Sequence, residues 1–313
     1  ERFDELLEQF SIARPKGLSV MTKEEAIKAA EQLGYPVLLR PSYVIGGQNM
    51  HIAFTQNDIE RYMDVILSQK IENPVLCDKY LMGTELEVDA ISDGVDVLIP
   101  GIMQHIERAG VHSGDSIAVY PPYNLSDAML KKVVDVSMKL AISLKTKGLI
   151  NIQYVVYQNE LYVIEVNPRA SRTIPYISKV TGVPMVELAT KILVGAKLKR
   201  LGYGTGLYPN SPYVAVKVPV FSFEKLNDVN SQLGPEMKST GEVLGIGKTI
   251  EEALFKGLVS AGFNMKHPTK QHPSGIYFTV NDQDKYEIVN IVKKFADLGL
   301  TFYATKGLSL IHI

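Results

Sequence analysis

The segment from residue 151 to residue 167 carries the pattern that most constrains the fold of this 313-residue chain. Two runs rich in β-branched and aromatic residues, 154–157 and 161–164, are separated by only three polar residues, Gln158-Asn159-Glu160. Such spacing predicts a β-hairpin, because the chain must turn back directly between the two strands. A three-residue loop would pair Tyr157 with Leu161, and the same register would place Gln153 opposite Glu165.

Helix signals alternate with strand signals along the rest of the chain. Thr22 and Glu25 form a capping box before an amphipathic run that Gly34 ends, and the longest helix is expected from Ser126 to Gly148. Further helices are predicted over 185–195 and 250–261, and strands over 36–40, 50–54, 75–81, 85–91 and 97–101. Hairpins that alternate with helices predict an α+β fold of antiparallel pairs, in small sheets that face each other across a cleft.

The C-terminal part of the chain reads as a separate unit. A polar stretch with two prolines, 267–273, predicts a linker. Strand, helix and strand patterns follow over 275–280, 284–298 and 300–304, as at the start of a βαβ unit. We therefore expect a nucleotide-cleft domain over 1–205, an extension of it over 206–266, the linker, and an incomplete α/β domain over 274–313.

Composition argues against several classes of function. The 33 basic and 34 acidic side chains leave a net charge of -1, so we expect neither nucleic acid nor an anionic membrane as a partner. The single cysteine, Cys77, rules out an intrachain disulfide and indicates a reducing, cytoplasmic location. Cys77 lies in an apolar run, which favours a buried residue over a nucleophile.

The chain opens at Glu1 without a methionine, so we expect it to be part of a longer protein.

Carboxylate, amide and guanidinium groups gather at the end of the predicted hairpin. Glu165 and Asn167 are two residues apart on a strand, so both project from one face, together with Gln153. Such a patch of oxygen ligands suits a hard divalent cation whose shell is completed by nucleotide phosphates. Arg169 and Arg172 follow, and a metal with arginines is a common means of neutralising a transferring phosphoryl group. The alternative is a solvent-facing strand edge with surface arginines.

Three further sites are weaker on their own. Arg40 ends a strand before a Gly-Gly turn at 46–47, which could bring backbone N–H groups close to phosphate but is also typical of a plain hairpin. His112 could contact a nucleotide or could be a solvated loop histidine. Glu85 and Glu87 face the same side of a strand, where a carboxylate could bind ribose hydroxyls or both could simply be exposed.

Taken together, these segments resemble the ATP-grasp family, in which two α+β subdomains grip ATP, and within it the large subunits of carbamoyl phosphate synthetases. The motifs that carry the resemblance occur in matching order and are Arg40-Pro41-Ser42-Tyr43-Val44, residues 110–116 and residues 165–172. The resemblance extends to about Gly307. Segments 42–47, 111–113 and 233–243 are similar to the C-terminal of the two homologous halves of that subunit, and the βαβ start resembles the methylglyoxal-synthase-like regulatory domain that follows this half.

The resemblance implies a reaction and a set of site residues. The half in question phosphorylates carbamate to carbamoyl phosphate with ATP and Mg²⁺ or Mn²⁺, while the N-terminal half phosphorylates bicarbonate and a glutaminase small subunit supplies ammonia. By matched position, the residues expected to bind the nucleotide are Arg40 at the phosphates, Lys79 and Leu81 at adenine, Glu85 at ribose, and Gly110, Val111, His112 and Ser113 along the nucleotide side of the cleft. The expected metal ligands are Gln153, Glu165 and Asn167. Arg169 and Arg172 are expected to bind carbamate and the transferring phosphoryl group. The metal set coincides with the patch inferred from the hairpin.

Two other readings compete with this one. A different ATP-grasp carboxylate ligase, such as a biotin-carboxylase-like or peptide-forming enzyme, would share the metal patch, but we would not expect it to combine the 110–116 loop with the regulatory start. A nucleotide-binding module without turnover would hold ATP and produce no ATP from carbamoyl phosphate. The family pattern ends soon after residues 305–307, so we expect the regulatory unit to be truncated.

Overall fold

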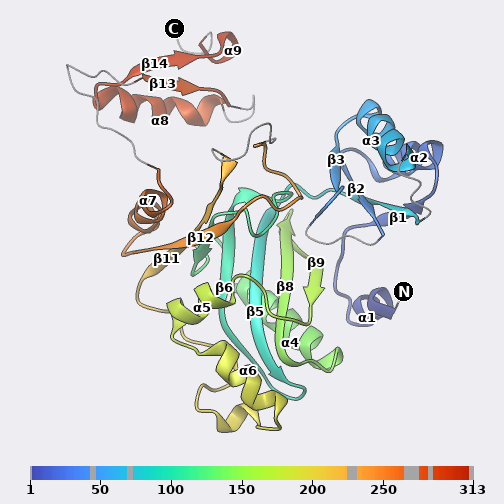
Figure 1. The fold of residues 1–313 in the computed structure, drawn as a ribbon, viewed down its shortest axis with the longest axis vertical. Helices are drawn as coiled ribbons and strands as arrows, with labels where there is room; N and C mark the ends of the chain where they lie inside the picture. The colour runs from blue at the N-terminus through green and yellow to red at the C-terminus, as the bar shows by residue number, and fades with distance from the viewer. Residues whose placement is uncertain are drawn as a thin grey trace. The chain divides into compact units, whose positions relative to one another are not determined.

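The computed structural model describes residues 2–42, 47–68, 73–223, 231–263, 275–280 and 285–309. Contacts divide the chain into two units, Glu1–Gly262 and Phe263–Ile313 (Figure 1). The predicted linker 267–273 and residues 43–46 of the glycine-containing turn lie outside the described residues. No helix in the described ranges is long and apolar enough to cross a membrane.

The N-terminal part of the first unit contains a small sheet on which α2 and α3 pack, whereas Leu7 of α1 packs in the core of the larger sheet. In its described residues the four strands are antiparallel, in the order β1-β4-β2-β3. The elements are α1 (Arg2–Gln9), β1 (Gly17–Val20), α2 (Lys23–Leu33), β2 (Val37–Pro41), β3 (His51–Ala53), α3 (Gln56–Ser68) and β4 (Val75–Lys79). The capping of α2 is as predicted: Thr22 Oγ1 accepts a hydrogen bond from Glu25 N at 3.2 Å, and Gly34 ends the helix with φ 75°. Cys77 is fully buried in this core, and burial raises the pKa of its thiol to about 11.

The rest of the first unit is built on a larger sheet. Its described strands run in the order β12-β11-β7-β6-β5-β8-β9, with the short β10 parallel to β6 and all other neighbours antiparallel. The elements are β5 (Thr84–Asp93), β6 (Val97–Arg108), β7 (Ala118–Tyr120), α4 (Asp127–Ser143), β8 (Lys147–Tyr157), β9 (Glu160–Asn167), α5 (Ile174–Thr181), α6 (Met185–Leu193), the 3₁₀ turn Leu198–Arg200, β10 (Gly206–Leu207), β11 (Val214–Val220), β12 (Gly241–Gly247) and α7 (Ile250–Ser260). The predicted α+β class with antiparallel pairs is confirmed.

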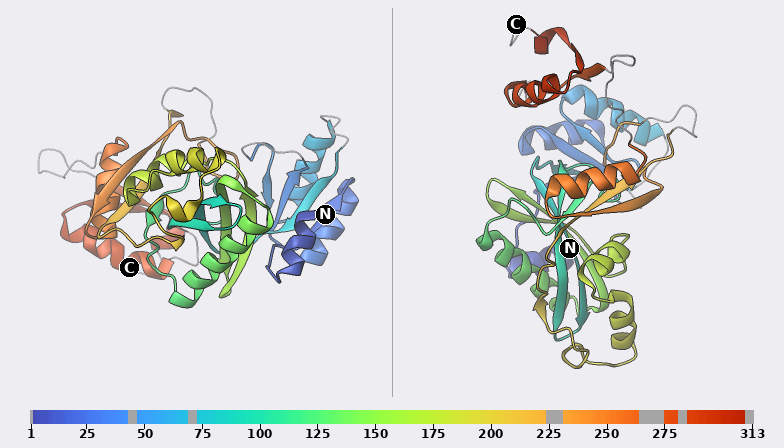
Figure 2. Two further views of the ribbon diagram at one scale, coloured as in Figure 1. Left: turned by 90° about the horizontal axis from the view of Figure 1, so that it is seen from below. Right: turned by 90° about the vertical axis from the view of Figure 1, so that its left-hand side faces the viewer.

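The two faces of this sheet differ. Leu86, Val88 and Ala90 of β5 pack with α4 in one core, whereas Ile91 packs with α5 and α6 on the opposite face. Figure 2 shows α4 (green) and α5–α6 (yellow) on opposite sides of the central strands. Because side chains alternate along a strand, Glu85, Glu87 and Asp89 share the face of Ile91, in the half of β5 toward its N-terminal end. On this face the polar residues Glu85, Glu87 and Asp89 are followed by the apolar Ile91 and then by the buried Asp93.

Two details of the prediction are wrong. The second sheet is not small, because β7, β11 and β12, which the strand patterns did not predict, extend it along one edge. The longest helix ends at Ser143 rather than Gly148, because the chain passes through Lys145 with φ 52° and enters β8 at Lys147. Residues 206–260 contribute β10, β11, β12 and α7 to the first unit.

The second unit contains β13 (Gly275–Phe278), α8 (Lys285–Asp297), β14 (Thr301–Ala304) and α9 (Lys306–Ser309). The two strands are parallel, with Tyr277 opposite Tyr303, so the predicted βαβ connection is confirmed. The Phe278 ring lies 6.1 Å from that of Phe295 on α8 and 5.7 Å from that of Phe302 on β14, and these rings join the helix to the strand pair.

Close packing of β12 on α7 gives a first prediction. A Cβ on Gly245 would overlap the carbonyl oxygen of Ala253 and lie 2.5 Å from the backbone nitrogen of Gly257. We expect Gly245→Ala to lower the free energy of unfolding by about 1–3 kcal/mol, as overpacking does elsewhere. Urea unfolding of both proteins measures the difference.

Gly241→Ala in the same strand is the matched control. None of the described residues places a heavy atom within 4 Å of the position that a Cβ on Gly241 would take. We expect this variant to be as stable as the wild type or more stable by less than about 1 kcal/mol. Equal losses in both variants would contradict the packing argument.

Candidate active site

The hairpin of β8 and β9 reaches the predicted pairing by a different route. Its loop has two residues, Gln158 and Asn159, both with positive φ, so Tyr157 pairs with Glu160 and not with Leu161. A register shift between Gln153 and Tyr154 then inserts one residue on β9. Gln153 therefore lies directly opposite Glu165, as the sequence predicts, although the loop length behind that prediction is wrong.

Polar side chains form two rows across the central strands. Directly paired residues on neighbouring antiparallel strands project from the same face of a sheet. The paired residues on β5, β8 and β9 are Glu87, Gln153 and Glu165 in one row and Asp89, Asn151 and Asn167 in the next. The register therefore places the three predicted metal ligands on one face, and their role as ligands remains a prediction.

The exposed part of these rows has the chemistry that a hard divalent cation needs. Glu165 is exposed, Gln153 and Asn167 are half-buried, and all three offer oxygen atoms. Gln153 Nε2 lies 3.3 Å from Ser113 Oγ and donates to it, so the amide oxygen is the atom of Gln153 suited to a cation. A single carboxylate with two amides fits a cation whose remaining ligands come from phosphate and water, which is the usual mode for Mg²⁺.

The predicted arginines lie in the segment between β9 and α5. Arg169 and Arg172 are both exposed. Arg169 N donates to Asn167 O at 2.8 Å, which turns the chain at the strand end. Arg172 Nη1 lies 2.8 Å from Met237 Sδ. The structure thus places two positively charged side chains directly after Glu165 and Asn167, on a segment that leaves the sheet.

The predicted nucleotide-side loop lies against the same face. Ser113 receives the hydrogen bond from Gln153, and its carbonyl oxygen accepts from Lys217 Nζ at 2.8 Å. His112 Nδ1 accepts from Gly114 N at 3.0 Å, which places the proton of the neutral ring on Nε2, and burial lowers the pKa of His112. Val111 is half-buried beside them.

Three predicted nucleotide residues have partners within the protein. Arg40, on β2, donates through Nε to Asp78 Oδ2 at 2.6 Å, and its side chain is 42% exposed. Lys79 Nζ, at the end of β4, donates to Gly34 O at 2.7 Å. Leu81 is buried in an apolar cluster with Ala109 and Val155.

Glu85 and Gly110 contact each other. Glu85 Oε1 accepts from Gly110 N at 3.1 Å, and its other oxygen lies 3.1 Å from His105 Nδ1. Gly110 has φ 105°, and a Cβ there would overlap the Tyr80 hydroxyl, so this position suits only glycine. Glu85 is therefore held between the loop and the sheet.

The sequence comparisons decide the family. The carbamoyl-phosphate synthase L chain, ATP binding domain family matches residues 1–201. The chain belongs to this family. It is 56% identical over 307 residues to the carbamoyl phosphate synthase large chain of Lachnoclostridium phytofermentans, covering 98% of this chain and 28% of that relative. The family resemblance seen in the motifs is thereby confirmed, and the chain spans about 28% of the length of this relative.

Solved structures confirm the ATP-grasp fold. The biotin carboxylase of Campylobacter jejuni in complex with β-γ-ATP aligns with TM-score 0.59 at 18% identity, over 71% of this chain and 50% of that one. The biotin carboxylase domain of the 2-oxoglutarate carboxylase of Hydrogenobacter thermophilus, in complex with MgADP, ADP and bicarbonate, aligns with TM-score 0.58 at 17% identity, over 78% of this chain and 60% of that one. At these identities the likeness establishes the fold alone. The family match and the fold together identify residues 1–201 as part of an ATP-binding domain of the ATP-grasp fold.

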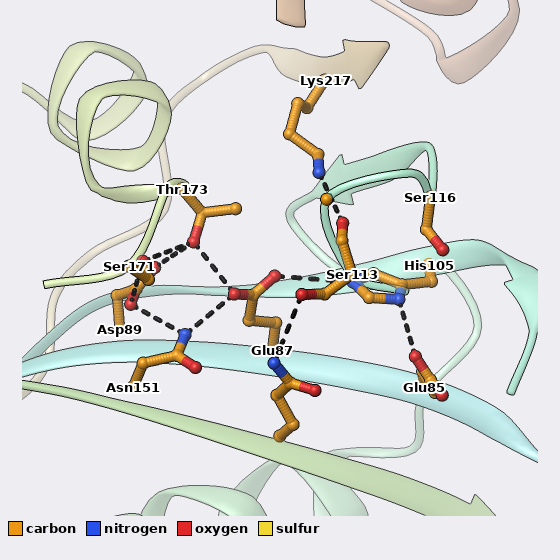
Figure 3. Close-up of polar contacts among 12 residues, drawn as sticks. Glu85, Glu87, Asp89, His105, Ser113, Ser116, Asn151, Ser171, Thr173 and Lys217 are labelled. Carbon is orange, nitrogen blue, oxygen red and sulfur yellow. Dashed lines mark hydrogen bonds and ion pairs between the residues drawn. The ribbon is translucent and has the colours of Figure 1, made fainter. Parts of the chain in front are cut away.

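Beneath the exposed residues of these rows lies a buried polar cluster that the sequence analysis did not predict (Figure 3). Its buried members are Glu87, Asp89, His105, Asn151, Thr173 and Lys217. The alternative of an exposed Glu87 is wrong, since its exposed fraction is 2%. The available signal was the alternation of carboxylates at 85, 87 and 89 with apolar residues at 86, 88 and 90, but the partners of the carboxylates come from distant segments.

Opposite charges within this cluster compensate one another. His105 Nε2 lies 3.5 Å from Glu87 Oε2, which makes an ion pair too long for a hydrogen bond. Burial acts to lower the pKa of His105, but Glu85 and Glu87 outweigh it and raise the pKa to about 9. Burial acts to raise the pKa of Glu87, whereas His105 and Lys217 hold it below its usual range. Burial and the charge of Glu87 raise the pKa of Asp89 to about 7.

Segment 231–240 connects several parts of the site. Gly234 O accepts from His112 N at 2.8 Å, and Asp115 accepts from Lys238 N and Ser239 N at 2.7 and 2.8 Å. A Cβ on Gly47 would overlap the carbonyl oxygen of Pro235, so the end of the glycine-containing turn lies against this segment. In the sequence, segment 233–243 contributed only to the family resemblance and did not predict these contacts.

The raised pKa of His105 predicts a pH-dependent stability. The folded pKa of about 9 exceeds the ordinary value of 6.5, so the stabilising charge is fully present below pH 6.5 and is lost as pH rises through 9. We expect the free energy of unfolding of the wild type to fall between pH 7 and about pH 9.5. His105→Gln should flatten this decline, as measured by urea unfolding at a series of pH values. Parallel curves for the two proteins would show that His105 is not charged at neutral pH.

Proposed function

We propose that this chain phosphorylates carbamate to carbamoyl phosphate with ATP, as the C-terminal synthetic half of a carbamoyl phosphate synthase large chain. The observation that carries the proposal is the direct pairing of Gln153 with Glu165 beside Asn167, with Arg169 and Arg172 immediately after the strand. Membership of the family adds the substrate class. The motifs 42–47, 111–113 and 233–243 support the C-terminal half.

The chemistry requires neutralisation of negative charge. Carbamate is an anion that attacks a more strongly charged phosphate, and catalysis of such transfers is mainly positioning and electrostatic stabilisation. When held by Gln153, Glu165 and Asn167, Mg²⁺ or Mn²⁺ would supply positive charge to the nucleotide phosphates. Arg169 and Arg172 would bind carbamate and the transferring phosphoryl group, since planar guanidinium groups match carboxylate and phosphate oxygens.

The likeness to a biotin carboxylase domain supports this arrangement. That domain was solved with MgADP and bicarbonate, so the same fold holds a magnesium nucleotide together with a small carboxylate-like anion. In the parent protein we propose that the N-terminal half supplies carbamate from bicarbonate and that a glutaminase small subunit supplies ammonia. Both would be partners of this domain in the cytoplasm, in arginine and pyrimidine precursor supply.

The reverse reaction tests the metal ligands. We expect Glu165→Ala to lower Mg²⁺-dependent formation of ATP from ADP and carbamoyl phosphate by roughly 100-fold, because the one carboxylate of the oxygen set is lost. Glu160→Ala is the matched control, since Glu160 lies on the same strand and pairs at the surface with Lys132 at 2.6 Å. An unchanged rate in Glu165→Ala would refute the metal assignment. A wild-type chain that binds ATP in calorimetry but forms none from carbamoyl phosphate would be a binding module.

The arginines are tested by separating the two substrates. We expect Arg172→Ala to raise the KM for carbamoyl phosphate by roughly 10- to 100-fold and to leave the Kd for ADP unchanged. Arg172→Lys should recover only part of the loss, because an ammonium group cannot bind a planar anion through two N–H groups. Arg200→Ala, an exposed arginine in the 3₁₀ turn, serves as the control. Weaker ADP binding in Arg172→Ala would place Arg172 on the nucleotide.

A further inference from the structure

The residues on either side of Arg172 are tied to one buried carboxylate. Ser171 Oγ donates to Asp89 Oδ1 at 2.7 Å, and Thr173 Oγ1 donates to Asp89 Oδ2 at 2.5 Å (Figure 3). Each carboxylate oxygen thus holds one neighbour of Arg172. The two hydroxyl oxygens lie 2.8 Å apart, so the segment closes tightly around the carboxylate.

Asp89 is itself held firmly. It is fully buried in β5, a central strand paired on both sides, and Asn151 Nδ2 donates to it at 2.9 Å from the neighbouring β8. The same Asn151 nitrogen donates to Glu87 Oε1 at 2.8 Å. These hydrogen bonds of Ser171 and Thr173 to Asp89, here called the tie, therefore fix the arginine segment (residues 168–173) to the sheet that also carries Gln153 and Glu165.

The Thr173 hydroxyl contacts Asp89 instead of capping the helix that follows it. It is the residue before α5, where a threonine hydroxyl normally accepts a hydrogen bond from a backbone N–H in the first turn of the helix. Here the hydroxyl makes no such bond and reaches Asp89, with Glu87 Oε1 at 3.0 Å as a second neighbour. A helix start without its side-chain cap is less stable, so the contact with the sheet takes precedence over the helix.

Arg172 depends on this tie for its position. Its side chain is exposed, and its contact with Met237 is also at the surface, since Met237 is 37% exposed. The direction in which the guanidinium points is therefore set mainly by the backbone from residue 168 to residue 173, which leaves the sheet and turns into α5.

We propose that Asp89 is a positioning residue that holds Arg172 toward the carbamate and phosphoryl site by fixing Ser171 and Thr173. The proposal rests on the proposed function of the site and adds to it a residue that does not touch the substrate. Loss of the tie misplaces the guanidinium, and displacement of a binding group by about 1 Å can cost a rate of roughly 100-fold.

Thr173 provides the sharpest test, because one pair of variants separates the hydroxyl from the shape of the side chain. Thr173→Val keeps the shape and removes the hydroxyl, whereas Thr173→Ser keeps the hydroxyl. In the full chain we expect Thr173→Val, and likewise Asp89→Ala, to speed amide hydrogen exchange in 169–173 by at least about tenfold, with exchange in 153–157 unchanged. Thr173→Ser should exchange like the wild type. Exchange in 169–173 at the wild-type rate in Thr173→Val would overturn the proposal.

Steady-state kinetics then tests whether the hydrogen bonds to Asp89 affect the use of carbamoyl phosphate. In ATP formation, Thr173→Val should raise the KM for carbamoyl phosphate or lower kcat by roughly 10- to 100-fold and leave the KM for ADP unchanged. Thr173→Ser should have the KM for carbamoyl phosphate and the kcat of the wild type. Equal changes in both KM values would indicate a general structural role and would also overturn the proposal. If the wild-type chain forms no ATP, the proposed function fails, and hydrogen exchange alone decides whether Asp89 fixes the segment.

Asp93→Asn is the matched control for Asp89. Asp93 lies on the same strand, is 4% exposed, and accepts hydrogen bonds from the backbone of Val95, Asp96 and Leu198, far along β5 from the arginines. This variant should lower the stability of the fold while leaving exchange in 169–173 and both KM values unchanged. A kinetic effect equal to that of Asp89→Ala would show that any buried aspartate of β5 acts in this way.

Discussion

Strand β5 must satisfy two environments on one face, and the rest of the site depends on how it does so. Ile91 makes part of this face apolar and packs with α5 and α6, and the buried Asp93 that follows it accepts hydrogen bonds from backbone N–H groups. Toward its N-terminal end the same face carries Glu85, Glu87 and Asp89, of which the last two are buried. Burial of unpaired carboxylates is strongly unfavourable, so the surrounding segments must bring cations and hydrogen-bond donors to them. His105, Asn151, Thr173 and Lys217 fill this requirement from β6, β8, the start of α5 and β11.

This compensation organises the exposed site. Lys217 also donates to the carbonyl oxygen of Ser113, and Ser113 accepts from Gln153, so loop 110–116 is joined both to the buried charges and to the row of paired residues Glu87, Gln153 and Glu165. Thr173 and Ser171 join the arginine segment to the same charges. The groups proposed to touch the substrates stand at the surface, and the groups that fix their positions lie one layer below. A preorganised site of this kind keeps its donors in place without rearrangement during the reaction.

Local patterns were enough to predict several features correctly. The capping box at Thr22, the buried Cys77 and the βαβ unit after residue 274 each follow from residues close in sequence. The hairpin is instructive because its loop length was predicted incorrectly, while the pairing of Gln153 with Glu165 was predicted correctly. A bulge compensates for the shorter loop, and nothing in the residue pattern around Ile164 marks it. The three-residue strand β7 lacked a local signal and is held by pairing with neighbouring strands, whereas the alternating valines of β11 are a local strand signal that was missed.

The sequence by itself determined the family, the α+β class and the candidates for metal and phosphoryl contact, because these depend on short motifs and on one hairpin whose paired residues are close along the chain. Only the tertiary structure decided which carboxylates are buried, that Lys217 and His105 neutralise them, and that one aspartate ties both neighbours of Arg172. The physical reason is the separation along the chain. Asp89 and Thr173 are 84 residues apart, and no local pattern encodes a contact that exists only once β5, β8 and α5 have packed together.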